Sequence, residues 1–395
     1  MNGKDTWIVR HGRISAFVLA AFCAGGAWAA TPNFAAEQGF ALDTTPLLVI
    51  AVDLNSDGKP DLVSGSNYSD GISVLINTSS GGSLSFANPV DMQGSFSVAV
   101  ADVNGDGKPD LIVPFDSDGA MVYVNTTPIG SATATFDMVY LGTGAGPFTV
   151  AAADLNGDGM PDIIVGNSGD NTISVFINTT TPGNATASFA AGQIFAAGNY
   201  PQSIAVGDLN GDGKSDIVVD NTMDNTISVL VNATANGASS ASFDTQQVFP
   251  VGELPNVVTL ADINNDGKLD VVIGNNMENF VSILRNTTTN GSGTVNFAAE
   301  YVVPTGNTPD SLAVADVDGD GMPDLIVGNA GDNTVSFIPN TTTSGSASLK
   351  FGTRVDFYTG NDPEGLVVAD LNGDGKLDIA TANLGDSELA VLLGQ

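Results

Sequence analysis

The chain has few basic residues, one cysteine and one histidine. Only 11 of its 395 residues are Lys or Arg, against 44 Asp or Glu, so the formal net charge is −33. A nucleic acid needs basic side chains to neutralise its phosphates, and this composition therefore excludes a nucleic-acid-binding protein. The hydrophobic fraction of 42% is high enough to build a substantial core, which excludes a disordered acidic chain.

Residues 1–29 are predicted to be a secretory signal peptide. Arg10 and Arg13 precede an apolar run from Ile14 to Ala27, and Ala27-Trp28-Ala29 offers a small-x-small cleavage site. The run is too short for a transmembrane helix, and no later apolar run reaches the required length of about 18 residues, so we expect no transmembrane segment. The expected location is secreted or extracellular, with the periplasm and the cell surface as alternatives.

Cleavage would remove the residues on which most nucleophilic catalysis depends. Cys23, His11 and both Trp residues (Trp7 and Trp28) lie before residue 30. The mature chain would contain no disulfide, no thiol nucleophile and no imidazole base, which excludes Ser–His and Cys–His mechanisms. We therefore expect that the protein is not an enzyme.

One motif, Asp-x-Asn/Asp-x-Asp-Gly-x-x-Asp, occurs seven times at intervals of 49 to 54 residues. Each repeat contains four short runs rich in Val, Ile, Thr and Phe between turn residues, as in residues 203–249, and none shows convincing helical periodicity. Four antiparallel strands per repeat, A to D, predict an all-β fold: a seven-bladed β-propeller of four-stranded blades, one domain over residues 30–395. The motif joins strand A to strand B.

The two ends of the chain are predicted to complete one blade together. The segment Asn33–Phe40 matches the D strand at residues 188–195, and the seventh repeat ends after its C strand, Glu388–Leu393. We expect the N-terminal strand to pair with this C strand and close the last blade. Closure would avoid an open array with unpaired strand edges.

The repeated motif has the composition of a calcium-binding loop. Asp at positions 1, 5 and 9 and Asn or Asp at position 3 supply four side-chain oxygens, and the position-7 carbonyl is an expected fifth ligand, as in an EF-hand loop. An ordinary turn needs only one or two Asx residues. An oxygen-only ligand set favours Ca²⁺ over zinc or copper, so we predict up to seven structural Ca²⁺ ions.

The predicted metal ligands fall into seven loops, numbered in chain order. They are Asp53, Asn55, Asp57 and Asp61 in loop 1; Asp102, Asn104, Asp106 and Asp110 in loop 2; Asp154, Asn156, Asp158 and Asp162 in loop 3; Asp208, Asn210, Asp212 and Asp216 in loop 4; Asp262, Asn264, Asp266 and Asp270 in loop 5; Asp316, Asp318, Asp320 and Asp324 in loop 6; and Asp370, Asn372, Asp374 and Asp378 in loop 7.

Segments such as residues 153–167 (ADLNGDGMPDIIVGN) resemble the FG-GAP/VCBS repeats of bacterial surface proteins and of the integrin α-subunit propeller. The Gly-x-x-Pro sequences before strand A, for example at residues 198–201, are similar to the second half of the motif that names the family. The first half, Phe-Gly, occurs only at Phe351-Gly352. The resemblance implies one Ca²⁺ per loop and an adhesion role; in integrins only some blades carry the loop.

Three functions remain open at this point. The first is a secreted, calcium-binding module that binds an unknown protein or glycan ligand at the cell surface, as a monomer. The second is a calcium-assisted polysaccharide lyase or hydrolase, although only Arg285, Lys350 and Arg354 of the mature basic residues lie outside position 7 of the loops. The third is a lectin, although the mature chain would have no Trp for sugar stacking.

The face opposite the metal loops is expected to carry one acidic residue in each turn between strands B and C. These residues are Asp70, Asp118, Asp170, Asp224, Glu278, Asp332 and Asp386. They could form an anionic ring for a cationic or metal-bridged partner, but the preference of Asp for tight turns is the interpretation that we favour. Tyr68 and Tyr200, on the same side, are expected to be ordinary surface aromatics. Turn preference also explains the many Asn-x-Ser/Thr sequences between strands C and D.

Overall fold

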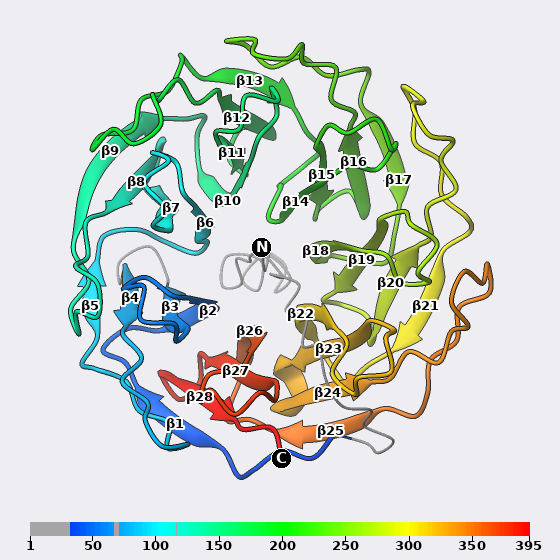
Figure 1. The fold of residues 1–395 in the computed structure, drawn as a ribbon. Helices are drawn as coiled ribbons and strands as arrows, with labels where there is room; N and C mark the ends of the chain where they lie inside the picture. The colour runs from blue at the N-terminus through cyan, green and yellow to red at the C-terminus, as the bar shows by residue number, and fades with distance from the viewer. Residues whose placement is uncertain (1–31, 67–70, 116) are drawn as a thin grey trace, which may run out of the picture.

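Seven four-stranded antiparallel sheets are arranged in a closed ring around a central axis (Figure 1). The computed structural model describes residues 32–66, 71–115 and 117–395, so the predicted signal peptide, Tyr68 and Asp70 lie outside the described residues. Within these ranges the one helical element is a short 3₁₀ turn, η1 (Ala330–Asp332). The prediction of an all-β, seven-bladed propeller is confirmed.

Blade n contains loop n, and strands A to D of each blade follow one another from the axis outwards. The strands are β2 (Pro46–Val52), β3 (Asp61–Ser66), β4 (Ile72–Leu75) and β5 (Val90–Met92) in blade 1; β6 (Ala99–Ala101), β7 (Asp110–Phe115), β8 (Gly119–Asn125) and β9 (Phe136–Gly142) in blade 2; β10 (Pro147–Ala153), β11 (Asp162–Asn167), β12 (Thr172–Phe176) and β13 (Gln193–Ala196) in blade 3; β14 (Ile204–Gly207), β15 (Asp216–Asn221), β16 (Thr226–Leu230) and β17 (Gln247–Pro250) in blade 4; β18 (Pro255–Ala261), β19 (Asp270–Asn275), β20 (Phe280–Leu284) and β21 (Tyr301–Pro304) in blade 5; β22 (Pro309–Ala315), β23 (Asp324–Asn329), β24 (Thr334–Ile338) and β25 (Val355–Tyr358) in blade 6; and β26 (Pro363–Ala369), β27 (Asp378–Asn383), β28 (Glu388–Leu392) and β1 (Gln38–Ala41) in blade 7.

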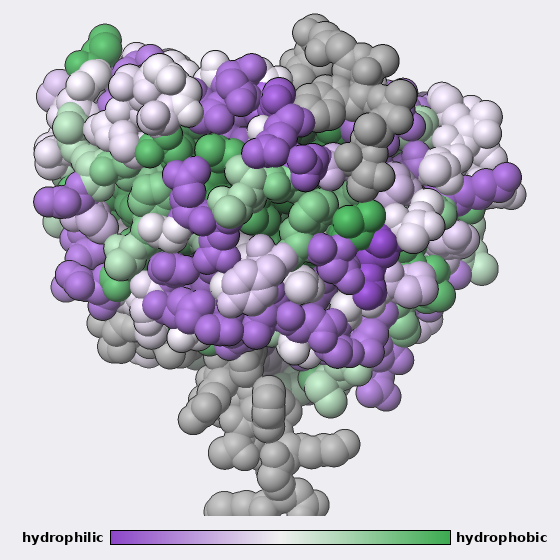
Figure 2. Space-filling view, turned by 90° about the horizontal axis from the view of Figure 1, so that it is seen from below, coloured by the Kyte–Doolittle hydropathy of each residue, from purple (hydrophilic) through white to green (hydrophobic). Residues whose placement is uncertain are grey.

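Burial along the strands follows their distance from the rim of the ring. Strand B of blade 3, β11, reads Asp-Ile-Ile-Val-Gly-Asn and is buried at every position, because neighbouring blades cover both of its faces. Five of the seven D strands alternate instead, since one face is turned outwards: in β13 and β17, Ile194 and Val248 are both 55% exposed. The side wall in Figure 2 accordingly shows hydrophobic side chains between hydrophilic ones.

The hydrophobic core lies between the blades. One cluster, for example, joins Val218 and Ile227 of blade 4 to Val258 and Ile273 of blade 5. Aromatic pairs extend these contacts towards the rim, where Phe249 of blade 4 meets Phe297 of blade 5 edge to face at 4.9 Å. Each blade therefore depends on its neighbours for burial of its apolar faces.

The ends of the chain close blade 7 as predicted. Strand β1 pairs antiparallel with β28, from Gln38 opposite Val391 to Ala41 opposite Glu388. The backbone N–H of Ala35 donates to the Leu393 carbonyl at 2.8 Å, which extends the pairing beyond β1. Phe40 packs edge to face against Phe86 of blade 1 at 4.9 Å, so the closing strand also reproduces the contact between neighbouring blades.

Candidate metal centres

The seven acidic loops occupy equivalent places between strands A and B. In every blade the last Asp of the motif, at position 9, is the first residue of strand B. Gly at position 6 has a φ between +85° and +88° in all seven loops, a conformation that other residues rarely adopt. This repeated turn folds the loop back onto the position-1 Asp, whose carboxylate accepts the position-6 N–H in all seven loops.

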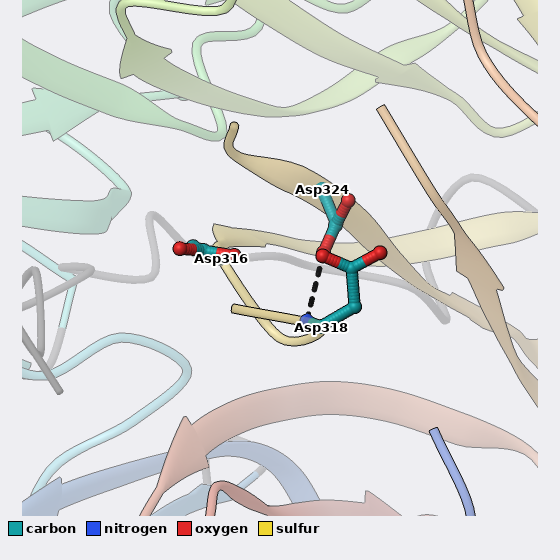
Figure 3. A group of neighbouring side chains, drawn as sticks. All are labelled: Asp316, Asp318 and Asp324. Atoms are coloured by element: carbon teal, nitrogen blue, oxygen red, sulfur yellow. Dashed lines mark hydrogen bonds between the residues drawn. The ribbon is translucent and has the colours of Figure 1, made fainter. Parts of the chain in front are cut away.

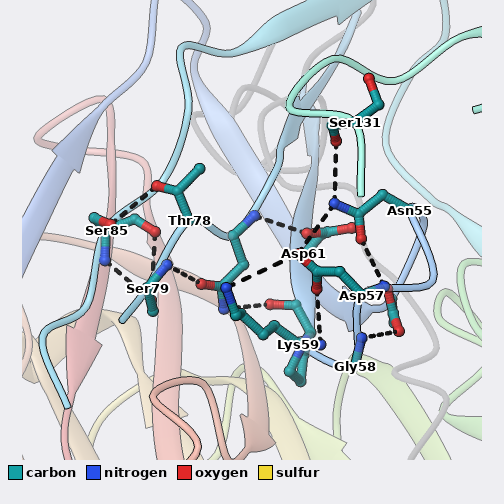
Figure 4. A network of polar contacts seen from close by, with 12 residues as sticks. Asn55, Asp57, Gly58, Lys59, Asp61, Thr78, Ser79, Ser85 and Ser131 are labelled. Carbon is teal, nitrogen blue, oxygen red and sulfur yellow. Dashed lines mark hydrogen bonds and ion pairs between the residues drawn. The ribbon is translucent and has the colours of Figure 1, made fainter. Parts of the chain in front are cut away.

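Backbone N–H groups of the loop orient the predicted ligand side chains, as loop 1 shows (Figure 4). The Asp53 carboxylate accepts the N–H groups of Asp57 and Gly58 at 3.1 and 2.8 Å. Asn55 Oδ1 accepts the Asp57 N–H at 3.0 Å, and Asp57 Oδ1 accepts the Lys59 N–H at 3.0 Å. The backbone of the loop therefore orders three of the four predicted oxygen donors, those at positions 1, 3 and 5.

The position-9 Asp has a second role that the motif alone does not reveal. Asp216, which has no exposed surface, accepts the N–H of Leu209 at position 2 of its loop and the N–H of Asn232 at the end of strand C, at 2.9 and 2.8 Å. Burial raises the pKa of Asp216 to about 6 although these two hydrogen bonds lower it, and burial raises the pKa of Asp270 to about 7. The carboxylate thus joins the loop to strands B and C.

The donor atoms fit a hard divalent cation. In loop 5 the side-chain oxygen of Asn264, one of the predicted ligand atoms, is buried and has no hydrogen-bond partner among the described residues. A cation bound to the loop would satisfy this atom and neutralise the adjacent carboxylates. In loop 6 the carboxylate oxygens of Asp316, Asp318 and Asp324 lie within 4.8 Å of one another (Figure 3). The identity of the metal and its ligands remains a prediction.

An Asn at the end of strand C connects each of six loops to the next blade. Asn232 Nδ2 donates to the Ser215 carbonyl of its own blade at 3.0 Å and to the Leu155 carbonyl of loop 3 at 2.8 Å, while its Oδ1 accepts the Thr234 N–H at 2.8 Å. We call the equivalent residues the clamp asparagines; all are at most 2% exposed. They are Asn77, Asn125, Asn178, Asn232, Asn286 and Asn340.

This role of the clamp asparagines is not predicted from the sequence. Each clamp asparagine begins an Asn-x-Ser/Thr sequence, and turn preference alone accounts for such a sequence. The one available signal is its fixed place, 16 residues after the position-9 Asp in five of six repeats and 15 in blade 2.

A second interblade contact covers loops 1 to 5. In loop 1 the backbone carbonyl of Asn55 accepts the N–H of Gly130, in the C–D loop of blade 2, at 2.8 Å. Asn55 Nδ2 donates to the Ser131 carbonyl of the same C–D loop at 3.0 Å (Figure 4). The glycine bond recurs in loops 2 to 5, and the amide bond recurs in loops 3 to 5. Position 3 is therefore both a predicted ligand and a contact to the next blade.

Loop 6 lacks both contacts within the described part of the chain. The C and D strands of blade 7 come from distant parts of the sequence, so no C–D loop joins them directly. Gly394 takes the place of a clamp asparagine: its N–H donates to Asp378 Oδ1 at 2.8 Å, but it has no side chain that could reach loop 6. At this open position the sequence also changes, because position 3 is Asp318 instead of Asn. Within the loop, the Asp318 N–H donates to Asp324 Oδ2 at 3.3 Å (Figure 3), and Asp318 Oδ1 accepts the Asp320 N–H at 3.1 Å.

The acidic residues of the opposite face have local hydrogen-bond partners. The carboxylate of Asp224 accepts the N–H of Asn199, in the link from strand D to the next strand A, at 2.8 Å. Asp332 and Asp386 accept the equivalent N–H groups of Asn307 and Asn361 at 2.8 and 2.7 Å. These bonds support the turn interpretation that we favoured from the sequence.

The structure defines a β-propeller with a repeated acidic motif in every A–B loop. Residues 53–113, 154–219, 262–327 and 316–381 match the FG-GAP-like repeat family, and residues 200–240 match the FG-GAP repeat. These matches span more than half of the chain, which therefore belongs to the FG-GAP-like repeat family and is an integrin-α-like FG-GAP propeller. The described residues include no helix with the length and apolar character that a membrane crossing requires.

Solved structures share the fold at low sequence identity. The crystal structure of BBS1N in complex with ARL6DN, soaked with mercury, is similar with a TM-score of 0.55 and 14% identity, over 92% of this chain and 96% of that chain. The same complex soaked with lead is similar with a TM-score of 0.55 and 13% identity, over the same shares of the two chains. At this identity the likeness concerns the fold alone.

Proposed function

We propose that this propeller is a secreted, calcium-stabilised binding or adhesion module with one structural Ca²⁺ in each acidic loop, and that it is not an enzyme. The observation that carries the proposal is the orphaned, buried oxygen of Asn264, which lies in a loop whose other predicted donors are carboxylates. Its partner is an unidentified protein or glycan at the cell surface.

The ions would act on the ring through the loops that hold them. The mature chain has 8 basic and 43 acidic residues, so seven Ca²⁺ ions would change its formal net charge from −35 to −21. Neutralising a loop removes repulsion among its carboxylates, and the position-9 Asp ties that loop to two strands. Because the clamp asparagines connect a loop to the next blade, the stabilisation extends to the interface between blades.

Thermal unfolding with and without a chelator tests the calcium proposal. A site held at about ten times its dissociation constant contributes about 1.4 kcal/mol, and seven independent sites contribute about 10 kcal/mol, which is comparable with the stability of a whole domain. We expect EDTA to lower the melting temperature strongly and added Ca²⁺ to restore it. An unchanged melting curve in EDTA would contradict the proposal.

A glycan array and a cell-surface binding screen, each with and without Ca²⁺, test the binding role. We expect calcium-dependent retention of a ligand without turnover. Incubation with acidic polysaccharides is the control, because a lyase would produce unsaturated sugars that absorb ultraviolet light. Such absorbance would favour the enzyme alternative.

A further inference from the structure

A side-chain hydrogen bond joins loops 5 and 6 directly. Position 4 is Gly in five loops but Asn265 in loop 5, where its φ is +53°. The side-chain Nδ2 of Asn265 donates to the backbone carbonyl of Gly321, at position 6 of loop 6, at 2.8 Å, and lies 3.2 Å from Met322 Sδ. The contact therefore joins the segment between two predicted ligands of loop 5 to the segment that carries the position-7 carbonyl of loop 6.

The two loops also differ in charge. Loop 6 has four carboxylates, and its position 7 is Met322. Loop 5 has three carboxylates, and two cations belong to it: Lys268 at position 7, and Arg285, whose guanidinium lies 4.0 Å from Asp266. Because the number of charged ligands tunes the affinity of an oxygen site for Ca²⁺, we expect loop 6 to bind Ca²⁺ more tightly than loop 5.

Loop 5 contains the atom that a neighbouring ion would help to organise. Asn264 Oδ1 is buried and unpartnered, whereas the equivalent Asn55 Oδ1 of loop 1 accepts an N–H at position 5. An ion in loop 6 would order Gly321 and Met322, and Asn265 is hydrogen-bonded to Gly321. Because Asn264 directly precedes Asn265, the same ion would also restrict the backbone that positions the Asn264 oxygen.

We propose that loops 5 and 6 form a coupled pair of Ca²⁺ sites, in which loop 6 fills first and its occupation strengthens binding in loop 5 through Asn265. This inference rests on the proposed calcium binding. Loop 6 is less restrained than the others because, among the described residues, it has neither a clamp asparagine nor the contact from the C–D loop of the next blade. This lack of restraint opposes tight binding. The extra carboxylate and the absence of a position-7 cation outweigh this loss, because they act directly on the charge at the site.

Hydrogen-exchange mass spectrometry across a series of free Ca²⁺ concentrations can follow each loop separately. In the wild type, we expect protection of residues 316–324 at the lowest Ca²⁺ concentration, with residues 262–270 next. Asp318→Asn should raise the midpoint of loop 6 by about tenfold and also raise that of loop 5. Asn265→Gly should leave loop 6 unchanged and weaken loop 5 by about fivefold.

Both variants are expected to fold. Gly is the residue found at position 4 of five loops and Asn is the residue found at position 3 of six, so both replacements have precedents in the same chain. Asp158→Asn in loop 3 is the matched control and should change neither midpoint. The same loop 5 midpoint in the Asn265→Gly and wild-type proteins, or a loop 6 midpoint above that of loop 5 in the wild type, would overturn the inference. Absence of calcium-dependent protection in every loop would instead refute the calcium proposal itself.

Discussion

Replacing a clamp asparagine tests whether the blades are held together by buried amides as well as by apolar contacts. In Asn232→Ala, three side-chain hydrogen bonds of 2.8 to 3.0 Å are lost. Each such bond contributes about 1 kcal/mol net, and the groups left unpaired lie in a buried interface, so we expect a loss of about 3 kcal/mol. Asn232→Asp should cost at least as much, because its carboxylate would face two carbonyl oxygens.

The loss is measured from guanidinium unfolding curves at saturating Ca²⁺ and again in EDTA. Asn184→Ala is the matched control: Asn184 also begins an Asn-x-Thr sequence but is exposed, so its replacement should change stability by less than about 0.5 kcal/mol. A loss below about 1 kcal/mol for Asn232→Ala, or one equal to that of the control, would refute the clamp argument.

Two further predictions concern the closing strand and a buried acid. Phe40→Ala should destabilise the protein by about 2 kcal/mol in thermal unfolding. Phe249→Ala in blade 4 should have a similar effect, because both rings make the same edge-to-face contact at 4.9 Å. A much smaller effect of Phe40→Ala would mean that closure contributes little. Asp220, buried in β15, accepts the N–H groups of Gln202 and Ser203 at 2.7 and 2.6 Å, and burial raises its pKa to about 7. Since the folded state holds this proton up to a higher pH than the unfolded state does, the contribution of Asp220 to stability falls as pH rises from about 4 to 7. The wild type should therefore lose about 3 kcal/mol relative to Asp220→Asn between pH 5 and 8, measured by denaturant unfolding at saturating Ca²⁺. Parallel pH profiles for the two proteins would contradict the assignment.

The architecture can be predicted from the sequence because it depends on local sequence patterns. Short runs of β-branched residues between turns define the strands, and the spacing of the acidic motif defines the blade. Closure is accessible for the same reason: residues 33–40 carry the pattern of a D strand, and the last repeat lacks one. A single sequence contains all of these periodicities.

The contacts between blades are not local, and the motif does not reveal them. Asn232 looks like a turn residue, since its partner Leu155 lies 77 residues away in a different repeat. Asp216 looks like a metal ligand alone, although both of its oxygens also accept backbone N–H groups. Asp220 is a charged residue within a buried run, which signals an unusual environment, but its two N–H donors become visible only when strands A and B are paired.

The staggered contacts imply that a sequence repeat and a folded unit do not coincide. A loop is finished by the C–D segment of the repeat that follows it, so one complete unit extends across two neighbouring repeats. Consider a circular permutant in which residues 395 and 33 are joined by a C–D segment and the chain is opened in the C–D segment of blade 3. Loop 6 would then gain the contacts that a C–D segment makes, and loop 2 would lose them. The location of the open loop is thus set by where the ring is cut.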